Sequence, residues 1–198
     1  MQNGGKYSIM SCSTYGKIEY NGNKICFGES TMPESRINCN LSLPYPNVTQ
    51  ADLNRYDAQM IYTLLAHKLS YVSEYITQCI MLERDYPRLA ELIECITLTE
   101  MKHFKLLARL LILSGERPDV RSLISRTRRK GVTQRQDSAA EALSFIDSAL
   151  GEEKSSVSDL RLVLSQLNDK GALRTLKRIL ADEEHHVDIL NNLRQRYS

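Results

Sequence analysis

From Asp57 onward the sequence carries long stretches of apolar residues at helical spacing, broken at only a few positions. Leu, Ile and Ala recur every three to four residues, which is the period of a helix with one buried face. Proline suits the first turn of a helix and glycine its end, so Tyr86-Pro87, Gly115 and Lys170-Gly171 mark the breaks. We therefore predict four helices, at about 57–83, 87–114, 138–167 and 171–195.

The connections between these helices are very short, then long, then short again, with residues 115–137 as the long one. Short connections place consecutive helices side by side and antiparallel. The sequence therefore predicts two antiparallel helical hairpins joined by one long crossover. This is an all-α, up-down-down-up four-helix bundle, which we assign to residues 51–198.

Residues 1–50 differ from the rest of the chain, because they hold three of its five prolines and lack long apolar periodicity. Within them, Asn21-Gly22 separates two short segments, Lys17–Tyr20 and Lys24–Phe27, and this pattern predicts a short β-hairpin. An isolated hairpin is marginal in water. We therefore expect an N-terminal arm that packs on the bundle or on a partner and mediates assembly.

Composition excludes several classes of protein. A net charge of +2 over 198 residues argues against a dedicated nucleic-acid binder. No apolar run approaches the ~18 residues of a membrane span, and the first ten residues lack the apolar core of a signal peptide. We therefore expect a cytoplasmic protein that binds neither nucleic acid nor membrane.

The five cysteines exclude some metal and redox motifs. None forms a C-x-x-C pair, which rules out a zinc ribbon, a rubredoxin-like iron site and a thioredoxin-type motif. Cys79 and Cys95 lie in apolar stretches of the predicted helices. We expect both to be reduced core residues.

Two Glu-x-x-His motifs are candidate metal-binding motifs: Glu100-Met-Lys-His103 on the second helix and Glu183-Glu-His-His186 on the fourth. Residues three apart share a helix face, so each Glu and His can bind one ion together. The inward stripes of helices two, three and four are apolar except at these motifs and at Glu153. Burying a bare carboxylate costs several kcal/mol, so such groups are paired, protonated or metal-bound. The pattern favours a metal site over a purely structural polar cluster.

These residues resemble the ferritin-like superfamily, and within it the small rubrerythrin-type and manganese-catalase-related bundles. The resemblance covers roughly Tyr62 to Leu193 and is carried by Tyr86-Pro87, Ile96-x-x-x-Glu100-Met-x-His103, Leu150-x-x-Glu153-Lys154 and Asp182-Glu-Glu-His-His186. In such proteins each hairpin supplies one Glu from its first helix and a Glu-x-x-His from its second. Together these residues hold two iron or manganese ions.

The resemblance implies a role for each matching residue. Glu100 and Glu183 would be bridging carboxylates, His103 and His186 terminal ligands, and Glu153 a terminal carboxylate. It further implies peroxide or oxygen chemistry of the peroxidase or catalase kind, and a homo-oligomer, commonly a dimer. Because rubredoxin-type cysteine pairs are absent from the sequence, electrons would come from an external donor protein.

The first hairpin departs from the family pattern. The remaining Glu should lie among residues 67–70, where no carboxylate occurs, and the inward-facing residue there is Lys68. The inward stripe of this helix is predicted to be Ile61, Leu65, Lys68, Val72, Ile76 and Cys79. Glu74 does not replace the missing ligand, because it falls on the polar face and about six residues, or ~9 Å of helix rise, too close to the loop.

Lys68 has three interpretations. Its ammonium can replace the charge of one metal, leaving a site for one ion or none. Alternatively, desolvation lowers its pKa until a neutral amine ligates or reacts, which makes Lys68 the candidate catalytic residue. The third interpretation is that Lys68 extends outward and has no role.

Three classes of function follow from the sequence. The first is a metal-binding protein that holds one or two iron or manganese ions, with redox chemistry at a modified site. The second is a non-enzymatic structural or assembly protein whose metal site has degenerated. The third is iron storage, which requires a closed shell of subunits that the sequence does not indicate.

Overall fold

The computed structural model describes residues 18–20, 23–25, 39–119 and 138–197. Residues 1–36 and 37–198 form separate compact units. In the first, strand β1 (Ile18–Tyr20) pairs antiparallel with strand β2 (Asn23–Ile25), with Ile18 opposite Ile25. The Asn21-Gly22 turn that the sequence predicts between them lies outside the described residues.

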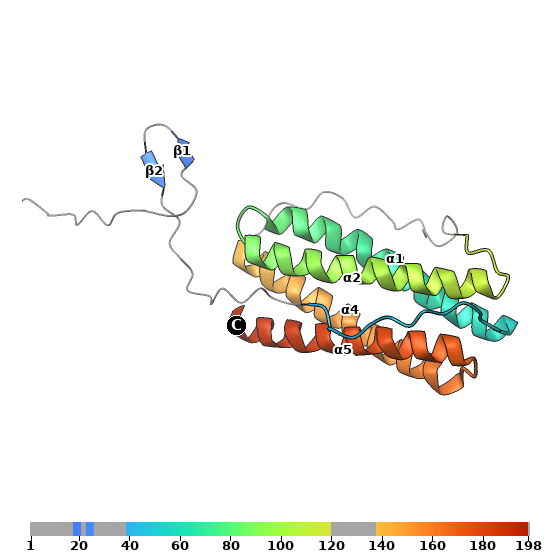
Figure 1. Cartoon of the computed structure of the whole chain (residues 1–198). Helices are drawn as coiled ribbons and strands as arrows, with labels where there is room; N and C mark the ends of the chain where they lie inside the picture. Colours follow the sequence, from blue (N-terminus) through green and yellow to red (C-terminus); the bar gives the residue numbers. More distant parts are fainter. Residues whose placement is uncertain (1–17, 21–22, 26–38, 120–137, 198) are drawn as a thin grey trace, which may run out of the picture. The chain divides into compact units, whose positions relative to one another are not determined.

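Four long helices make up most of the described part of the second unit (Figure 1). They are α1 (Arg55–Leu82), α2 (Pro87–Leu113), α4 (Ser138–Gln166) and α5 (Lys170–Tyr197). These bounds lie close to those predicted from apolar spacing. The prediction of an all-α four-helix bundle is confirmed.

The helix ends follow from local sequence chemistry. The side chain of Asn54 accepts hydrogen bonds from two first-turn amides of α1, and Asp169 accepts one from a first-turn amide of α5. Pro87 is the first residue of α2. Gly115 follows the same helix with a φ of 89°, a conformation that glycine adopts without the steric cost of a Cβ atom.

The parts of each helix that meet in one apolar cluster show in which direction each helix runs. One apolar cluster contains Leu65 from the first half of α1, Leu110 near the end of α2, Leu160 from the second half of α4 and Leu176 from the first half of α5. Each hairpin is therefore antiparallel, while α2 and α4 run in the same direction (Figure 1). The end of α2 and the beginning of α4 therefore lie at opposite ends of the bundle.

The core has two apolar ends and a polar middle. A second apolar cluster, with Leu82, Leu89, Ile146 and Leu190, fills the other end of the bundle. Buried charged and imidazole side chains lie on the middle turns of all four helices. Among the described residues, no helix has a stretch long and apolar enough to span a bilayer.

The predicted inward stripes hold with one clear exception on α1. On α2 the whole predicted stripe is buried: Leu89, Ile93, Ile96, Glu100, His103, Leu107 and Leu110. On α1 the prediction for Ile76 was wrong, because its side chain is 46% exposed and lines a surface groove between α1 and α2. Its neighbour Tyr75 is fully buried instead, with its hydroxyl bonded to a carboxylate of α4. A tyrosine can face a polar layer in a way that an isoleucine cannot.

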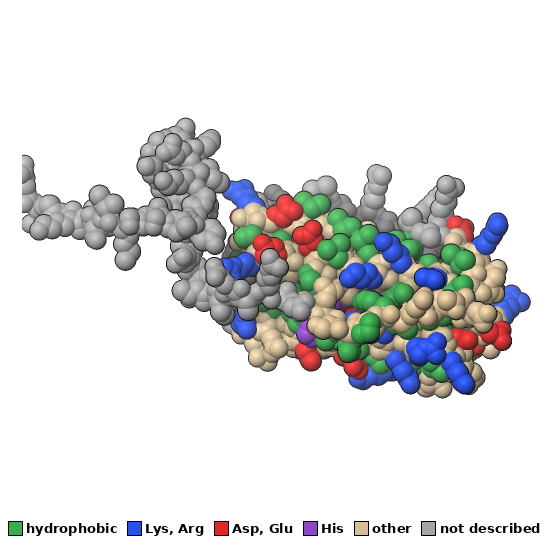
Figure 2. Space-filling view, in the orientation of Figure 1, with side chains coloured by type: hydrophobic (Ala, Val, Ile, Leu, Met, Phe, Trp, Pro, Cys, Tyr) green, Lys and Arg blue, Asp and Glu red, His purple; other side chains and the backbone are tan. Residues whose placement is uncertain are grey.

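Apolar, basic and acidic side chains are interspersed on the face of the bundle shown in Figure 2. Leu98, which is 55% exposed, and Ile112, which is 61% exposed, are among the large apolar side chains that reach solvent from α2. Exposed apolar residues of this kind are normal on globular proteins. By themselves they define no binding surface.

Candidate metal centre

All six residues selected from the sequence lie together in the polar middle of the bundle. Their side chains are at most 1% exposed, and every helix contributes at least one: Lys68 from α1, Glu100 and His103 from α2, Glu153 from α4, and Glu183 and His186 from α5. The spacing of each Glu-x-x-His motif turns both of its side chains to the same helix face. Apolar side chains close the cluster at both ends.

The ammonium of Lys68 lies between two of the carboxylates. Its Nζ is 2.7 Å from Glu100 Oε2 and 2.6 Å from Glu183 Oε2, and it donates a third bond of 2.9 Å to Ser156 Oγ. Lys68 therefore does not extend outward. The geometry is that of an ion-paired, three-donor ammonium.

Electrostatics keep this lysine protonated. Burial by itself lowers the pKa of Lys68, but the charges of Glu100, Glu183 and Glu153 outweigh it and raise that pKa above its ordinary value. The same ammonium, together with the two histidines, lowers the pKa of Glu183 against the effect of burial. A neutral, nucleophilic amine at this position is not supported.

Four side chains present ligand atoms to one another. Ligand atoms of Glu100, Glu153, Glu183 and His186 all lie within 4.8 Å of one another. His186 Nδ1 is 3.4 Å from Glu153 Oε2 and 3.7 Å from Glu100 Oε1. Carboxylates with an imidazole form the kind of ligand set that iron and manganese accept.

Several of these atoms make no hydrogen bond of good geometry. Glu100 Oε1, Glu153 Oε2 and His186 Nε2 are buried without a hydrogen bond of good geometry to any described residue. Buried polar atoms of this kind are costly unless a proton, a water molecule or a cation satisfies them. Burial and the neighbouring carboxylates raise the pKa of Glu153 to about 7. The cluster thus fits a cation in the part that Lys68 does not occupy.

The net charge of the cluster can be balanced by one divalent ion or by two protons. Glu100, Glu153 and Glu183 as carboxylates carry three negative charges, against one positive charge on Lys68. With both imidazoles neutral, one divalent cation cancels the remainder, whereas two would leave an excess of two positive charges. A buried site tolerates such an excess poorly. Protons on the two histidines would achieve the same balance without a metal.

His103 is held from both sides of its ring. Its Nδ1 lies 2.8 Å from Glu183 Oε1 and 3.2 Å from Glu100 Oε1, while its Nε2 lies 3.0 Å from Asp182 Oδ2. Burial lowers the pKa of His103, but the charge of Glu100 and hydrogen bonds from the imidazole to Asp182, Glu100 and Glu183 raise it well above its ordinary value. A carboxylate on the far nitrogen is the usual means of fixing the orientation of a ligating imidazole.

Asp182 is the centre of a second network behind His103. Arg178 Nη1 lies 2.5 Å from Asp182 Oδ1, and the Tyr45 hydroxyl donates to Asp182 Oδ2 at 2.6 Å. Burial raises the pKa of Asp182, but hydrogen bonds from His103, Arg178 and Tyr45 lower it to about 2. Asp182 therefore connects His103 to Arg178 and Tyr45.

Three other residues contribute to this region and were not identified from the sequence: Tyr45, Tyr75 and Ser156. The Tyr75 hydroxyl donates to Glu153 Oε1 at 2.9 Å, and Ser156 accepts from Lys68. The position of Tyr75 one helical turn from Tyr71 and two turns from Lys68 was the available signal, but tyrosine at such spacing is common in ordinary cores.

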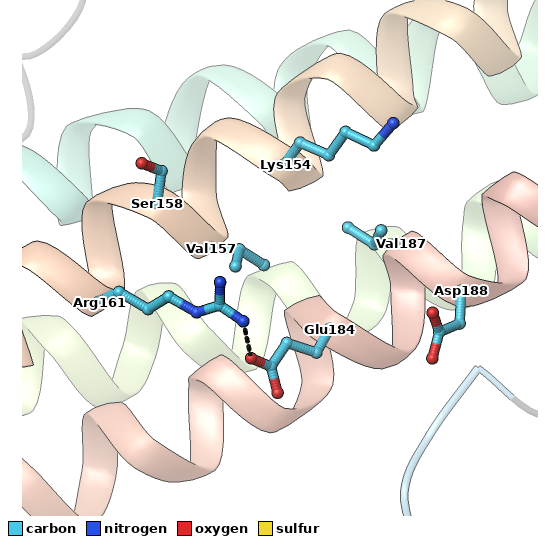
Figure 3. Close-up of a pocket in the computed structure, with 7 residues that line it drawn as sticks. All are labelled: Lys154, Val157, Ser158, Arg161, Glu184, Val187 and Asp188. Carbon is cyan, nitrogen blue, oxygen red and sulfur yellow. Dashed lines mark hydrogen bonds and ion pairs between the residues drawn. The ribbon is translucent and has the colours of Figure 1, made fainter.

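A surface groove of about 670 Å³ lies between α4 and α5 and includes none of the buried cluster residues (Figure 3). It is lined by Lys154, Val157, Ser158, Arg161, Glu184, Val187 and Asp188. Arg161 and Glu184 close part of it with an ion pair of 2.7 Å. The groove by itself does not indicate the charge of a ligand, because charged residues of both signs line it.

The prediction for Cys95 was wrong. Cys95 forms a disulfide with Cys39, whose Cα atom lies 6.0 Å away, and Cys79 is free. Spacing along α2 gave no sign of this bond, because its partner comes from an extended segment 56 residues earlier. That segment packs on α2 only in the folded chain.

No known protein-family model matches this sequence, and no curated protein matches it either. The four-helix architecture and the buried carboxylate–histidine cluster therefore carry the assignment of function.

Proposed function

We propose that this protein binds one divalent iron or manganese ion in the buried cluster, with Glu100, Glu153, Glu183 and His186 as ligands. The observation that carries the proposal is that ligand atoms of these four residues lie within 4.8 Å of one another in a fully buried site. His103, oriented by Asp182, is a fifth candidate ligand through Nδ1. Lys68 replaces the charge of a second ion.

The arrangement also supports a ferritin-like bundle as the architecture. Two antiparallel hairpins with α2 and α4 parallel, and a Glu-x-x-His motif on the second helix of each hairpin, are features of that superfamily. When bound, iron or manganese would supply one-electron redox chemistry toward peroxide or oxygen. The chain's own residues orient the ligands, exclude bulk water and hold the Lys68 ammonium against Glu100 and Glu183. An external protein would supply the electrons.

Metal analysis tests the proposal. Protein stripped with a chelator, reconstituted with Mn²⁺ or Fe²⁺ and freed of excess metal should retain about one equivalent, since four protein ligands suffice for a stable site. Glu183→Gln should retain almost none. Glu184→Gln, at the exposed neighbouring position, is the matched control and should bind as the wild type does.

A second variant tests the role of Lys68. Lys68→Glu restores the missing carboxylate and should raise the metal content toward about two equivalents, as expected of a di-metal carboxylate bundle. Two equivalents in the wild type would overturn the charge-replacement role. No metal in the wild type after reconstitution would overturn metal binding itself.

One observation favours a structural protein as the second candidate. Lys68 already pairs with Glu100 and Glu183 at 2.7 and 2.6 Å, and protonated histidines could balance the rest of the charge. The cluster would then be a buried polar network that fixes how the four helices pack. Retention of the fold and its stability without any bound metal, together with no metal uptake, would support this alternative.

A further inference from the structure

Residues 39–50, here called the strap, lie along the bundle between α2 and α5 as extended chain before α1 begins (Figure 1). The disulfide from Cys39 to Cys95 fastens one end to α2. At the other end, the buried side chain of Val48 packs against the beginning of α5, where a Cβ atom on Gly171 would come within 2.9 Å of Val48 Cγ1. The strap is therefore fixed to two different helices.

The middle of the strap contacts the network behind His103. The Tyr45 hydroxyl donates to Asp182, and Asp182 contacts His103 Nε2. The Arg178 guanidinium lies 4.3 Å from the centroid of the Tyr45 ring and donates from Nε to the carbonyl of Leu43 at 3.0 Å. Tyr45 of the strap is thus connected to the candidate ligand His103 through one residue, Asp182.

The covalent end of the strap lies close to another ligand. Cys95 is five residues before Glu100 on α2, and Thr99 lies between them. The Thr99 hydroxyl donates to Asn40 Oδ1 at 2.8 Å, while Asn40 Nδ2 donates to Cys95 Sγ at 3.6 Å. The first residues of the strap therefore pack against the α2 turn that presents Glu100.

The two cysteine residues differ in exposure. Cys39 is fully buried, whereas Cys95 is partly exposed. Thiol–disulfide exchange proceeds by attack of a thiolate on an accessible sulfur. We therefore expect a reductant to attack Sγ of Cys95, the more exposed residue, with Cys39 as the leaving thiolate.

We propose that the Cys39–Cys95 pair is a thiol–disulfide exchange site, through which a dithiol reductant loosens the strap and weakens metal binding in the cluster. A dithiol thiolate attacks Cys95 Sγ, and the bond to Cys39 breaks. The second thiolate of the reductant then displaces Cys95. Two electrons and two protons pass to the protein, which gains two thiols, and the reductant becomes a disulfide. The effect on metal rests on the proposed function, whereas the loosening of the strap does not.

The first experiment uses the full chain without metal, so that it is independent of the proposed function. The Arg178 Nε–H signal in a nitrogen–proton NMR spectrum reports the contact with Leu43. Reduction by dithiothreitol should speed its exchange with water about tenfold, because local opening exposes the proton. Equal exchange rates in the oxidised and reduced protein would overturn the proposal.

Cysteine variants test whether the faster exchange after reduction arises from the Cys39–Cys95 disulfide. The double variant Cys39→Ser/Cys95→Ser should exchange like the reduced wild type and should not respond to dithiothreitol. Cys79→Ser removes a cysteine that forms no disulfide and should behave as the wild type in both states. Because dithiothreitol acts on the wild-type chain, the test does not depend on whether the double variant folds. A response to dithiothreitol that persists in the double variant would overturn the assignment.

The second experiment measures metal. Release of Mn²⁺ to a chelator should be about tenfold faster from the reduced protein, since loss of contacts that orient a ligand typically costs 10–100-fold in affinity. An unchanged release rate would overturn the link to the cluster. If neither form binds Mn²⁺, the proposed function fails and the link with it, while the NMR result still decides whether the strap responds to reduction.

Discussion

The Lys68 ammonium and the Glu183 carboxylate lie 2.6 Å apart in a part of the core where at most 1% of either side chain is exposed. Glu100 lies 2.7 Å from the same nitrogen atom. One cation therefore joins α1 to α2 and α5 at the centre of the bundle. This contact leaves the three carboxylates of the cluster with two uncompensated negative charges when both imidazoles are neutral.

Removing the ammonium should destabilise the metal-free protein strongly. In Lys68→Met, Glu100 and Glu183 stay buried without their cation, and loss of one partner of a buried ion pair costs about 3–5 kcal/mol. The free energy of unfolding from urea titration measures the loss. Lys154→Met, at an exposed lysine of α4, should change it by less than about 0.5 kcal/mol. A loss below about 1 kcal/mol in Lys68→Met would contradict the prediction.

Removing the Tyr75 hydroxyl should have a smaller effect of the same sign. Tyr75→Phe preserves the buried ring but deprives Glu153 Oε1 of its 2.9 Å donor. An unsatisfied buried acceptor costs about 1–3 kcal/mol. Tyr71→Phe, at a half-buried ring stacked on Tyr75, is the control and should cost less in the same denaturant titration. Equal losses in the two variants would show that the bond to Glu153 contributes little.

Asp182→Asn should lower stability by removing the charge that pairs with Arg178 and accepts from Tyr45. Because Arg178 is 8% exposed, its uncompensated charge should cost about 3 kcal/mol. Thermal unfolding followed by circular dichroism checks this. Asp188→Asn, one turn and a half further along α5 and exposed, should leave the midpoint almost unchanged. A midpoint for Asp182→Asn that matches Asp188→Asn would contradict the prediction.

The same glycine-to-alanine change should have opposite effects at two positions. At Gly171 an added Cβ would come within 2.9 Å of Val48 Cγ1 and 3.0 Å of Gln50 O, so the strap must move, at a cost of about 1–3 kcal/mol. At Gly151, inside α4, nothing lies within 4 Å of the added atom, and alanine should stabilise the helix by about 1 kcal/mol. Urea titration of both variants measures the two effects. A stabilised Gly171→Ala would contradict the close packing of the strap.

Local features of the sequence were sufficient to predict the helices. Apolar spacing gave four stretches, and Pro87 and Gly115 marked ends that the structure confirms. These are properties of short segments, which is why no tertiary information was needed. Glu100, His103, Glu153, Glu183 and His186 were identified for the same reason, because each is a polar interruption of an otherwise apolar stripe.

Contacts between segments that are far apart in the chain could not be predicted from the sequence. The side chain of Tyr45 meets Asp182 across 137 residues, and Cys39 bonds to Cys95 across 56. Neither pair carries a spacing signal, because an extended segment can pack on any exposed groove. The prediction that Ile76 is buried was wrong because it assumed that α1 buries a single narrow face. The helix packs against both α2 and α4.

The sequence by itself determined that this chain forms four amphipathic helices and that carboxylates and histidines interrupt their buried faces, because helix period and polarity are properties of neighbouring residues. Only the tertiary structure decided that Lys68 is a charged partner of Glu100 and Glu183, rather than a neutral amine or a solvent-exposed side chain. The balance between desolvation and ion pairing depends on how many carboxylates surround the ammonium. That number is set by the packing of helices that are far apart in the sequence.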